Sequence, residues 1–143
     1  YANEDRYEGI WNEGDKNGTG RYVCHAEKFQ YIGDFRMNKR TGNGKIEYKD
    51  GRSYDGKWLD DKRHGKGVAQ TALGVYDGVW GHDEMTGAGR MTYTPGGAGG
   101  GVYDGDWKSG KRHGEGKMKF GDGDVYLVST SLTKPLKWGL ICY

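Results

Sequence analysis

The chain has 143 residues, a net charge of +2 and a mean hydropathy of -0.96, with 34% hydrophobic residues. This length has room for one domain, and the low apolar fraction argues against an ordinary two-layer globule. The small net charge gives no electrostatic reason to expect a nucleic-acid partner, and no apolar run is long enough for a membrane-spanning helix. Because aromatic residues reach 13%, we expect a small core of Tyr and Trp rather than disorder.

A motif of Tyr-x-Gly-x-aromatic, then Gly-x-Gly, recurs about every 23 residues, which is the period of a repeat array. The opening tyrosines are Tyr7, Tyr31, Tyr54, Tyr76 and Tyr103. The rings four positions later are Trp11, Phe35, Trp58, Trp80 and Trp107. The spacing from Tyr to Gly-x-Gly is constant, so nothing is inserted inside any unit. The predicted organisation is a flank, five repeats and a C-terminal segment: 1–6; 7–30, 31–53, 54–75, 76–102 and 103–125; and 126–143.

Each unit is predicted to be a β-hairpin. In the third unit, residues 54–58 alternate large apolar with polar side chains, which is strand periodicity. Residues 59–64 are polar and are expected to form a loop, after which Gly65-x-Gly67 begins the second strand. A further Gly near the end of most units, such as Gly51, marks the turn to the next Tyr. The fold class is therefore all-β: an elongated, single-layer, twisted antiparallel sheet of consecutive hairpins.

Strand alternation places Tyr, Gly and Trp on one face, and Gly there lets neighbouring rings lie flat on the backbone. We expect a groove only partly filled by its own rings. The opposite face is predicted to carry charges from both strands of the hairpins: Asp34, Asp55, Asp77 and Asp104, and Arg21, Lys45, Arg90 and Lys117.

Two segments break the pattern. Residues 95–101 are Gly-rich and are predicted to be a flexible loop rather than a phosphate cradle. From Tyr126 onward, Val128 and Thr130 stand where Gly and Trp are expected. The segment 126–143 is interpreted as a cap over the open sheet edge, with a docking segment as the alternative.

The repeated pattern resembles the MORN repeat. Near-consensus segments are Tyr103-Asp-Gly-Asp-Trp-Lys-Ser-Gly-Lys-Arg-His-Gly-Glu-Gly116, and Tyr54-Asp-Gly-Lys-Trp58 with Lys62-Arg-His-Gly-Lys-Gly67. The resemblance covers residues 7–125, with a degenerate sixth unit. It implies a hairpin ribbon that often acts as a scaffold and takes up an extended or helical partner segment in an aromatic groove. It also implies settings such as the cytoskeleton, cilia and flagella, membrane junctions, or a larger enzyme.

Candidate partner-binding residues are the ten rings of the repeats, which also form the core. Large exposed aromatic patches mark interaction sites. The candidate groove comprises Tyr7, Trp11, Tyr31, Phe35, Tyr54, Trp58, Tyr76, Trp80, Tyr103 and Trp107.

A second candidate surface is a row of loop cations for lipid head groups or another anion. The row comprises Lys39, Arg40, Lys62, Arg63, Lys111 and Arg112. Neighbouring carboxylates such as Asp61 and Asp83 dilute it, so solvated turn residues are the favoured interpretation.

Nothing in the sequence indicates catalysis, a metal or a cofactor. His64 and His113 are roughly 20 Å apart by strand spacing, too far for one zinc ion, and neither His25 nor His82 has a partner at useful spacing. Two isolated cysteines, Cys24 and Cys142, make no disulfide framework, and a reducing compartment is expected.

The leading hypothesis is a non-enzymatic structural or adaptor protein of the cytoplasm, bound to a partner protein within a cytoskeletal or ciliary/flagellar (axonemal) complex. One alternative is a peripheral membrane or phosphoinositide-binding module that uses the basic loops. The other is a regulatory arm of a larger enzyme. No nucleic-acid partner is expected. Since the chain opens at Tyr1, we expect a fragment of a longer protein.

Overall fold

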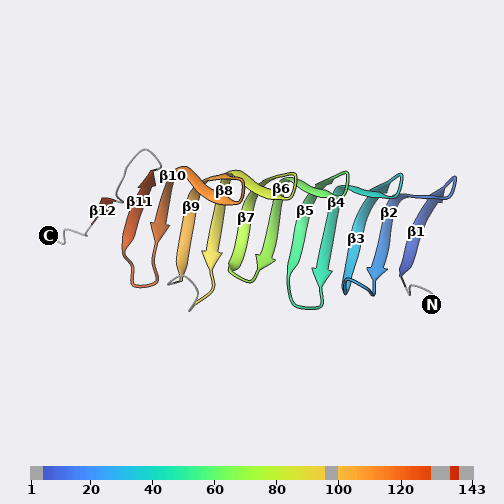
Figure 1. Ribbon diagram of the computed structural model, residues 1–143, viewed down its shortest axis with the longest axis horizontal. Coiled ribbons are helices and arrows are strands. Elements are labelled where there is room, and N and C mark those ends of the chain that lie inside the picture. Colours follow the sequence, from blue (N-terminus) through green and yellow to red (C-terminus); the bar gives the residue numbers. More distant parts are fainter. Residues whose placement is uncertain (1–4, 96–99, 130–135, 139–143) are drawn as a thin grey trace.

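The computed structural model describes residues 5–95, 100–129 and 136–138, all within one antiparallel sheet (Figure 1). Twelve strands follow one another in chain order, and each pairs with its chain neighbours. The strands are β1 (Arg6–Asn12), β2 (Asp15–Cys24), β3 (Phe29–Arg36), β4 (Lys39–Tyr48), β5 (Ser53–Leu59), β6 (Lys62–Thr71), β7 (Gly74–Gly81), β8 (Glu84–Tyr93), β9 (Gly101–Lys108), β10 (Lys111–Lys119), β11 (Val125–Ser129) and β12 (Leu136–Trp138). The predicted hairpin ribbon is thus confirmed, with β1 and β12 at its opposite ends.

The turn inside each repeat is shorter than the sequence suggested. The third unit turns on Asp60 and Asp61 alone, and its second strand begins at Lys62, not at Gly65. Both turn residues have positive φ, 46° and 68°, the geometry whose twist matches that of antiparallel strands. The expected loop over residues 59–64 was therefore wrong, because such a turn needs only two residues.

The Gly-x-Gly motif forms a bulge in the middle of each second strand, where the pairing shifts in register. Its first glycine has φ between 57° and 65° in all five repeats, a conformation that favours Gly. In the second repeat, Asp34 stabilises the bulge by accepting a hydrogen bond from the Asn43 backbone N–H at 3.0 Å. The motif is thus a local kink inside a continuous strand.

The second glycine of the motif leaves room for the ring of the repeat tyrosine. The ring of Tyr54 lies against Gly67, and a Cβ at Gly67 would overlap the tyrosine hydroxyl. That hydroxyl donates to the Lys57 carbonyl at 2.8 Å, and the other four repeat tyrosines make the same bond to the residue three positions on. The tyrosine hydroxyls therefore serve the hairpin itself.

The core lies entirely on one side of the sheet, which we call the aromatic face. The repeat rings of units two to five are at most 5% exposed: Tyr31, Phe35, Tyr54, Trp58, Tyr76, Trp80, Tyr103 and Trp107. We expected a groove only partly filled by its own rings, but these eight rings are packed together as a core and leave no open groove between them. In the first unit, Trp11 is 55% exposed.

The other side of the sheet, the polar face, carries alternating charges across neighbouring strands. Lys45 is opposite Asp55, and Arg90 lies between Asp77 and Asp104. The Arg90–Asp104 ion pair measures 2.6 Å, but both side chains are more than half exposed, so it stabilises the sheet only modestly. The register that the sequence left open is thus one of complementary charges.

The two segments that break the repeat fall partly outside the described residues. Of the Gly-rich segment 95–101, residues 96–99 lie outside. In the degenerate unit, β11 and β12 extend the sheet at its C-terminal end, whereas residues 130–135 and 139–143, with Cys142, lie outside. The interpretation of 126–143 as a cap therefore stays a prediction.

Candidate functional site

The repeats are joined by a chain of edge-to-face ring contacts along the aromatic face. Tyr54 meets Trp58 of its own repeat at 5.2 Å between ring centroids and Trp80 of the next at 5.3 Å. The indole N–H of Trp80 then donates to the carbonyl of Gly67 in the preceding repeat at 3.1 Å. Trp58 and Trp107 make the equivalent bonds to Gly44 and Gly89. Each Trp is therefore the element that docks one repeat on the one before it.

An arginine and an aspartate close two of these junctions in the same way, and we call each arrangement a clasp. Arg40 Nε lies 2.9 Å from Asp61 Oδ1, and the same oxygen accepts the Arg40 backbone N–H at 3.0 Å. The Arg40 guanidinium also lies 4.5 Å from the Trp58 ring centre, within cation–π range. In the second clasp, Arg63 pairs with Asp83 at 3.0 Å and covers Trp80 at 4.3 Å.

The clasps show that two of the predicted anion-binding residues, Arg40 and Arg63, are already paired with aspartates of this chain. Arg40 and Arg63 are the second residues of strands β4 and β6 instead of lying in loops, and their guanidinium groups donate hydrogen bonds to the next repeat. Asp61 and Asp83, interpreted from the sequence as diluting a basic stripe, are their partners. The signal was present in the sequence: in both units Asp comes three residues after Trp and faces an Arg of the preceding unit.

The other predicted cations are exposed at the start of their second strands. Within residues 5–95, 100–129 and 136–138, the side chains of Lys39, Lys62, Lys111 and Arg112 form no ion pair. The Arg112 Cζ atom lies 5.6 Å from the centre of the Tyr103 ring. Contact between this row and an anion stays a prediction.

A set of partly buried rings that is not part of the predicted groove borders the buried core. We call it the aromatic fringe: Tyr22, Phe29, Tyr48, Tyr93 and Phe120. Tyr22, Tyr48 and Tyr93 lie within the last three residues of their second strands, and Phe120 directly follows β10. Each of the four comes two residues after a buried position, and this alternation places them on the aromatic face. The fringe rings are therefore partly accessible to a binding partner, whereas the repeat rings of units two to five are buried.

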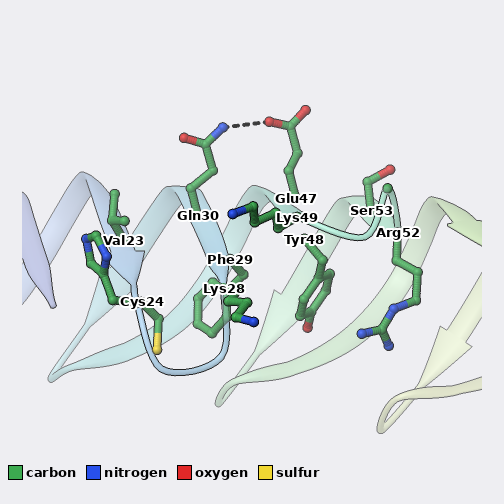
Figure 2. A pocket seen from close by; sticks show the side chains of 12 residues that line it. Val23, Cys24, Lys28, Phe29, Gln30, Glu47, Tyr48, Lys49, Arg52 and Ser53 are labelled. Atoms are coloured by element: carbon green, nitrogen blue, oxygen red, sulfur yellow. Dashed lines mark hydrogen bonds between the residues drawn. The ribbon is translucent and has the colours of Figure 1, made fainter. Parts of the chain in front are cut away.

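The fringe borders a cavity of about 740 Å³ between the turns that join the first three repeats (Figure 2). Phe29 and Tyr48 lie in it side by side, with ring centroids 5.7 Å apart. Arg52 stacks on Tyr48 at 4.7 Å and pairs with Asp50, so its charge is compensated. On the opposite side of the strands, Gln30 donates to Glu47 at 2.7 Å. The cavity combines apolar walls with polar rims, and Cys24 and His25 also line it.

Burial raises the pKa of the repeat tyrosines. The pKa of Tyr54 and that of Tyr76 rise to about 12, chiefly because their rings are removed from water. Tyr22 has a raised pKa mainly because it donates a 2.6 Å hydrogen bond to the Asp5 carboxylate. These phenols are neutral structural groups at physiological pH.

The histidines differ from expectation in one respect. His64 and His82 come within 5.9 Å between ring centres, because the second strand of one repeat lies beside the turn of the next. The sequence spacing did not predict this ring contact. Among the described residues no cluster of three or more His, Cys, Asp or Glu side chains is arranged to hold a metal ion. Cys24 is a buried free thiol.

The MORN-repeat model matches five segments of the chain: 7–25, 31–51, 54–71, 76–98 and 103–125. A ribbon of hairpins in which each tyrosine rests on a glycine pair defines the class, a β-hairpin repeat protein. The chain belongs to the MORN-repeat family.

Similar curated proteins share only part of their length with this chain. MORN repeat-containing protein 3 of Xenopus laevis is 33% identical over 73 residues, which is 47% of this chain and 31% of that protein. Alsin of Rattus norvegicus and of Homo sapiens are each 34% identical over 93 residues, which is 60% of this chain and 6% of Alsin. The chain thus spans less than a third of each of these relatives. In the part of the chain that the structure describes, no helix is long and apolar enough to cross a bilayer.

Proposed function

We propose that this MORN-repeat chain is a non-enzymatic adaptor that holds a segment of a partner protein along its aromatic face. The observation that carries the proposal is the aromatic fringe, a line of half-buried rings beside a filled core. Tyr and Phe in such positions supply large contact area at low entropic cost, and exposed aromatic patches mark interaction surfaces. The buried repeat rings form the floor, so contact falls to the fringe, Tyr7 and Trp11.

The cellular setting that we propose is a cytoplasmic cytoskeletal or ciliary/flagellar assembly. This part of the proposal is supported by the family resemblance alone. An extended segment suits the ribbon best, because twelve strands at about 4.8 Å spacing give a surface on the order of 50 Å long.

Paired substitutions on the two faces test the binding surface. Tyr48→Ser with Tyr93→Ser removes fringe rings, and we expect loss of partner capture from native extract with the circular dichroism of the sheet retained. Val68→Ser with Val75→Ser is the matched control, since both valines are exposed on the polar face. Capture that survives the first pair, or fails equally with the second, would contradict the proposal.

Peripheral membrane binding is the alternative, favoured by the exposed cations Lys39, Lys62 and Lys111 at equivalent positions along one edge. It predicts sedimentation with anionic vesicles that is lost when these lysines are changed to Glu and that weakens as salt is raised. Absence of sedimentation at low salt would remove this alternative. A role as a regulatory arm of a larger enzyme is the second alternative. The chain covers 6% of Alsin, so a longer protein can contain repeats of this kind, and the full-length sequence tests this alternative.

A further inference from the structure

The junction between the third and fourth repeats brings two histidine rings together. His64 is the third residue of β6, and His82 lies in the two-residue turn between β7 and β8. Their ring centres are 5.9 Å apart, with an angle of 79° between the ring planes. Gly65 pairs with Trp80 in the register of β6 with β7, so the turn that carries His82 comes beside the start of β6. The pair lies in the middle of the sheet, with described strands on both sides.

Backbone hydrogen bonds hold the two histidines in this relation. The Asp83 N–H donates to the Arg63 carbonyl at 3.1 Å, and the Arg63 N–H donates to Asp83 Oδ1 at 2.9 Å. Asp83 follows His82 in the chain and Arg63 precedes His64, so these bonds fix the backbone next to each ring. The short separation of the rings therefore follows from the second clasp.

The His64 ring has a polar atom that the protein leaves without a partner. Its Nδ1 is buried, and in the part of the chain that the structure describes no group forms a hydrogen bond with it. A buried nitrogen in this state costs free energy, and a bound ion that takes up its lone pair removes the cost. At the first junction, by contrast, Asn17 holds the position of His64, and its Oδ1 accepts the Met37 backbone N–H at 3.2 Å.

The hairpin fold does not require histidine at either position. Of the four junctions between the five repeats, the one between repeats three and four has histidine at both. The corresponding residues at the other three are Asn17 with Met37, Thr41 with Asp60, and Thr86 with Ser109. The histidine pair is therefore specific to this junction.

The separation of the rings suits two ligands of one metal ion. A metal–nitrogen bond of about 2.0–2.1 Å puts each ring centre roughly 3 Å from the ion, so two ring centres on one ion lie at most about 6 Å apart. The observed 5.9 Å is within that limit. His82 is exposed in its turn, and a rotation of its side chain shortens the separation toward that of a tetrahedral site.

The surrounding charges favour a metal that binds neutral nitrogen. Outside the clasp, the charged residues at neighbouring positions are three lysines and two carboxylates: Lys57, Lys62, Lys66, Asp60 and Glu84. The clasp itself pairs Arg63 with Asp83 and adds no net charge. Ca²⁺ and Mg²⁺ bind through oxygen ligands, above all carboxylates, which this setting supplies poorly. Imidazole nitrogen instead suits Zn²⁺, Cu²⁺ and Ni²⁺.

We propose that His64 and His82 together bind one divalent transition-metal ion of the Zn²⁺ class. No third His, Cys, Asp or Glu is arranged to join them within the described ranges, so water completes the coordination. The ion links β6 to the turn between β7 and β8 and thus joins repeats three and four. Because the link exists in the folded chain, metal binding stabilises that chain by mass action.

Zinc titration of the 143-residue chain, free of any histidine tag, tests the site. Calorimetry is expected to show saturable binding of one ion per chain, and NMR of the imidazole groups should show the His64 and His82 signals shifting together. Zn²⁺ should also raise the thermal midpoint of unfolding. Absence of saturable binding, or shifts confined to His25 or His113, would overturn the proposal.

Two variants and a matched control assign the ligands. His82→Asn keeps a residue that tolerates the φ of 50° at this turn position, and His64→Gln keeps a polar side chain. Each should weaken zinc binding at least about tenfold, since even a residue that only orients a metal ligand is worth that much. His113→Gln removes the histidine at the position of His64 in the fifth repeat and should bind zinc like the wild type.

Circular dichroism without zinc shows which variants are folded. If His64→Gln does not fold, His82→Asn decides alone, because that side chain is exposed in a turn. Unchanged affinity in a folded ligand variant, or an equal loss in His113→Gln, would contradict the assignment of this pair.

Discussion

At the scale of single residues, the structure depends on tyrosine rings that pack so closely on glycines that no Cβ atom fits between them. Each repeat tyrosine lies flat on a pair of glycines, and its hydroxyl donates a hydrogen bond to a backbone carbonyl of its own hairpin. Gly is needed at the second position of Gly-x-Gly because of this ring, whereas at the first it is favoured by the positive φ of the bulge. Two glycines in one motif therefore have two different physical reasons.

Gly67→Ala is predicted to destabilise the fold by about 1–3 kcal/mol, because its Cβ overlaps the ring of Tyr54 and the strand must shift. Gly121→Ala is the matched control, since that position is open and its φ is not positive, and we expect less than about 0.5 kcal/mol. Urea unfolding measures both. Equal midpoints for the two variants would contradict the role given to the glycine pair.

Asp83→Gly should cost about 1–2 kcal/mol, because it removes the acceptor of two Arg63 hydrogen bonds while keeping a residue that tolerates a φ of 73°. Asp60→Gly makes the same change in a turn, at a carboxylate for which no bond is found among the described residues, and should cost nothing. The same unfolding assay compares them, and an equal loss for both would refute the clasp.

The raised pKa values predict a loss of stability in alkali. For Tyr76, with a pKa near 12 in the fold and about 10 when unfolded, the neutral form is favoured by folding. Its contribution is therefore complete below pH 10 and is lost as pH rises from 10 through 12. Unfolding free energies across this range should fall less steeply for Tyr76→Phe than for the wild type; parallel curves would contradict burial of the phenol.

At the scale of the hairpin, a single aromatic position sets how well each repeat docks on the preceding one. Phe35 fills the position that Trp occupies elsewhere, and it packs on Tyr7 at 5.2 Å without an indole N–H. The carbonyl of Gly20 corresponds by register to the acceptors Gly44 and Gly67. The junction between the first two repeats thus lacks one hydrogen bond that three others have.

Phe35→Trp is predicted to stabilise the chain by about 0.5–1.5 kcal/mol through the added hydrogen bond to Gly20. Phe35→Leu is the comparison, since it lacks both ring and donor and should destabilise. Thermal and urea unfolding give the sign, and a tryptophan variant less stable than the wild type would show that this junction cannot hold an indole.

The sequence predicted the hairpin ribbon because period and alternation are local signals that need no knowledge of distant contacts. It placed Tyr54 and Trp58 on the correct face for the same reason. It missed the two-residue turn at Asp60 and Asp61, since turns of this type usually contain Gly or Asn and this one does not. It also missed the Arg40–Asp61 clasp, because that contact joins two repeats and depends on a register that composition does not reveal.

At the scale of the whole molecule, the chain is a one-dimensional stack of hairpins. Buried rings lie along the aromatic face, and exposed charged side chains of both signs lie along the polar face. Each repeat contacts only its neighbours, so stability is a sum over junctions and the ends differ from the middle. The aromatic face is the side that combines ring area with long, uninterrupted extent. That combination is the basis for assigning partner binding to it.

Site-specific photo-crosslinking on strand β8 tests this assignment most directly. A photoreactive amino acid replaces Tyr93 on the aromatic face or Thr92, its exposed neighbour on the polar face, and each protein is irradiated in native extract. We predict a discrete crosslinked partner from position 93 and none from position 92. The same product from both positions, or a product from position 92 alone, would contradict partner binding along the aromatic face.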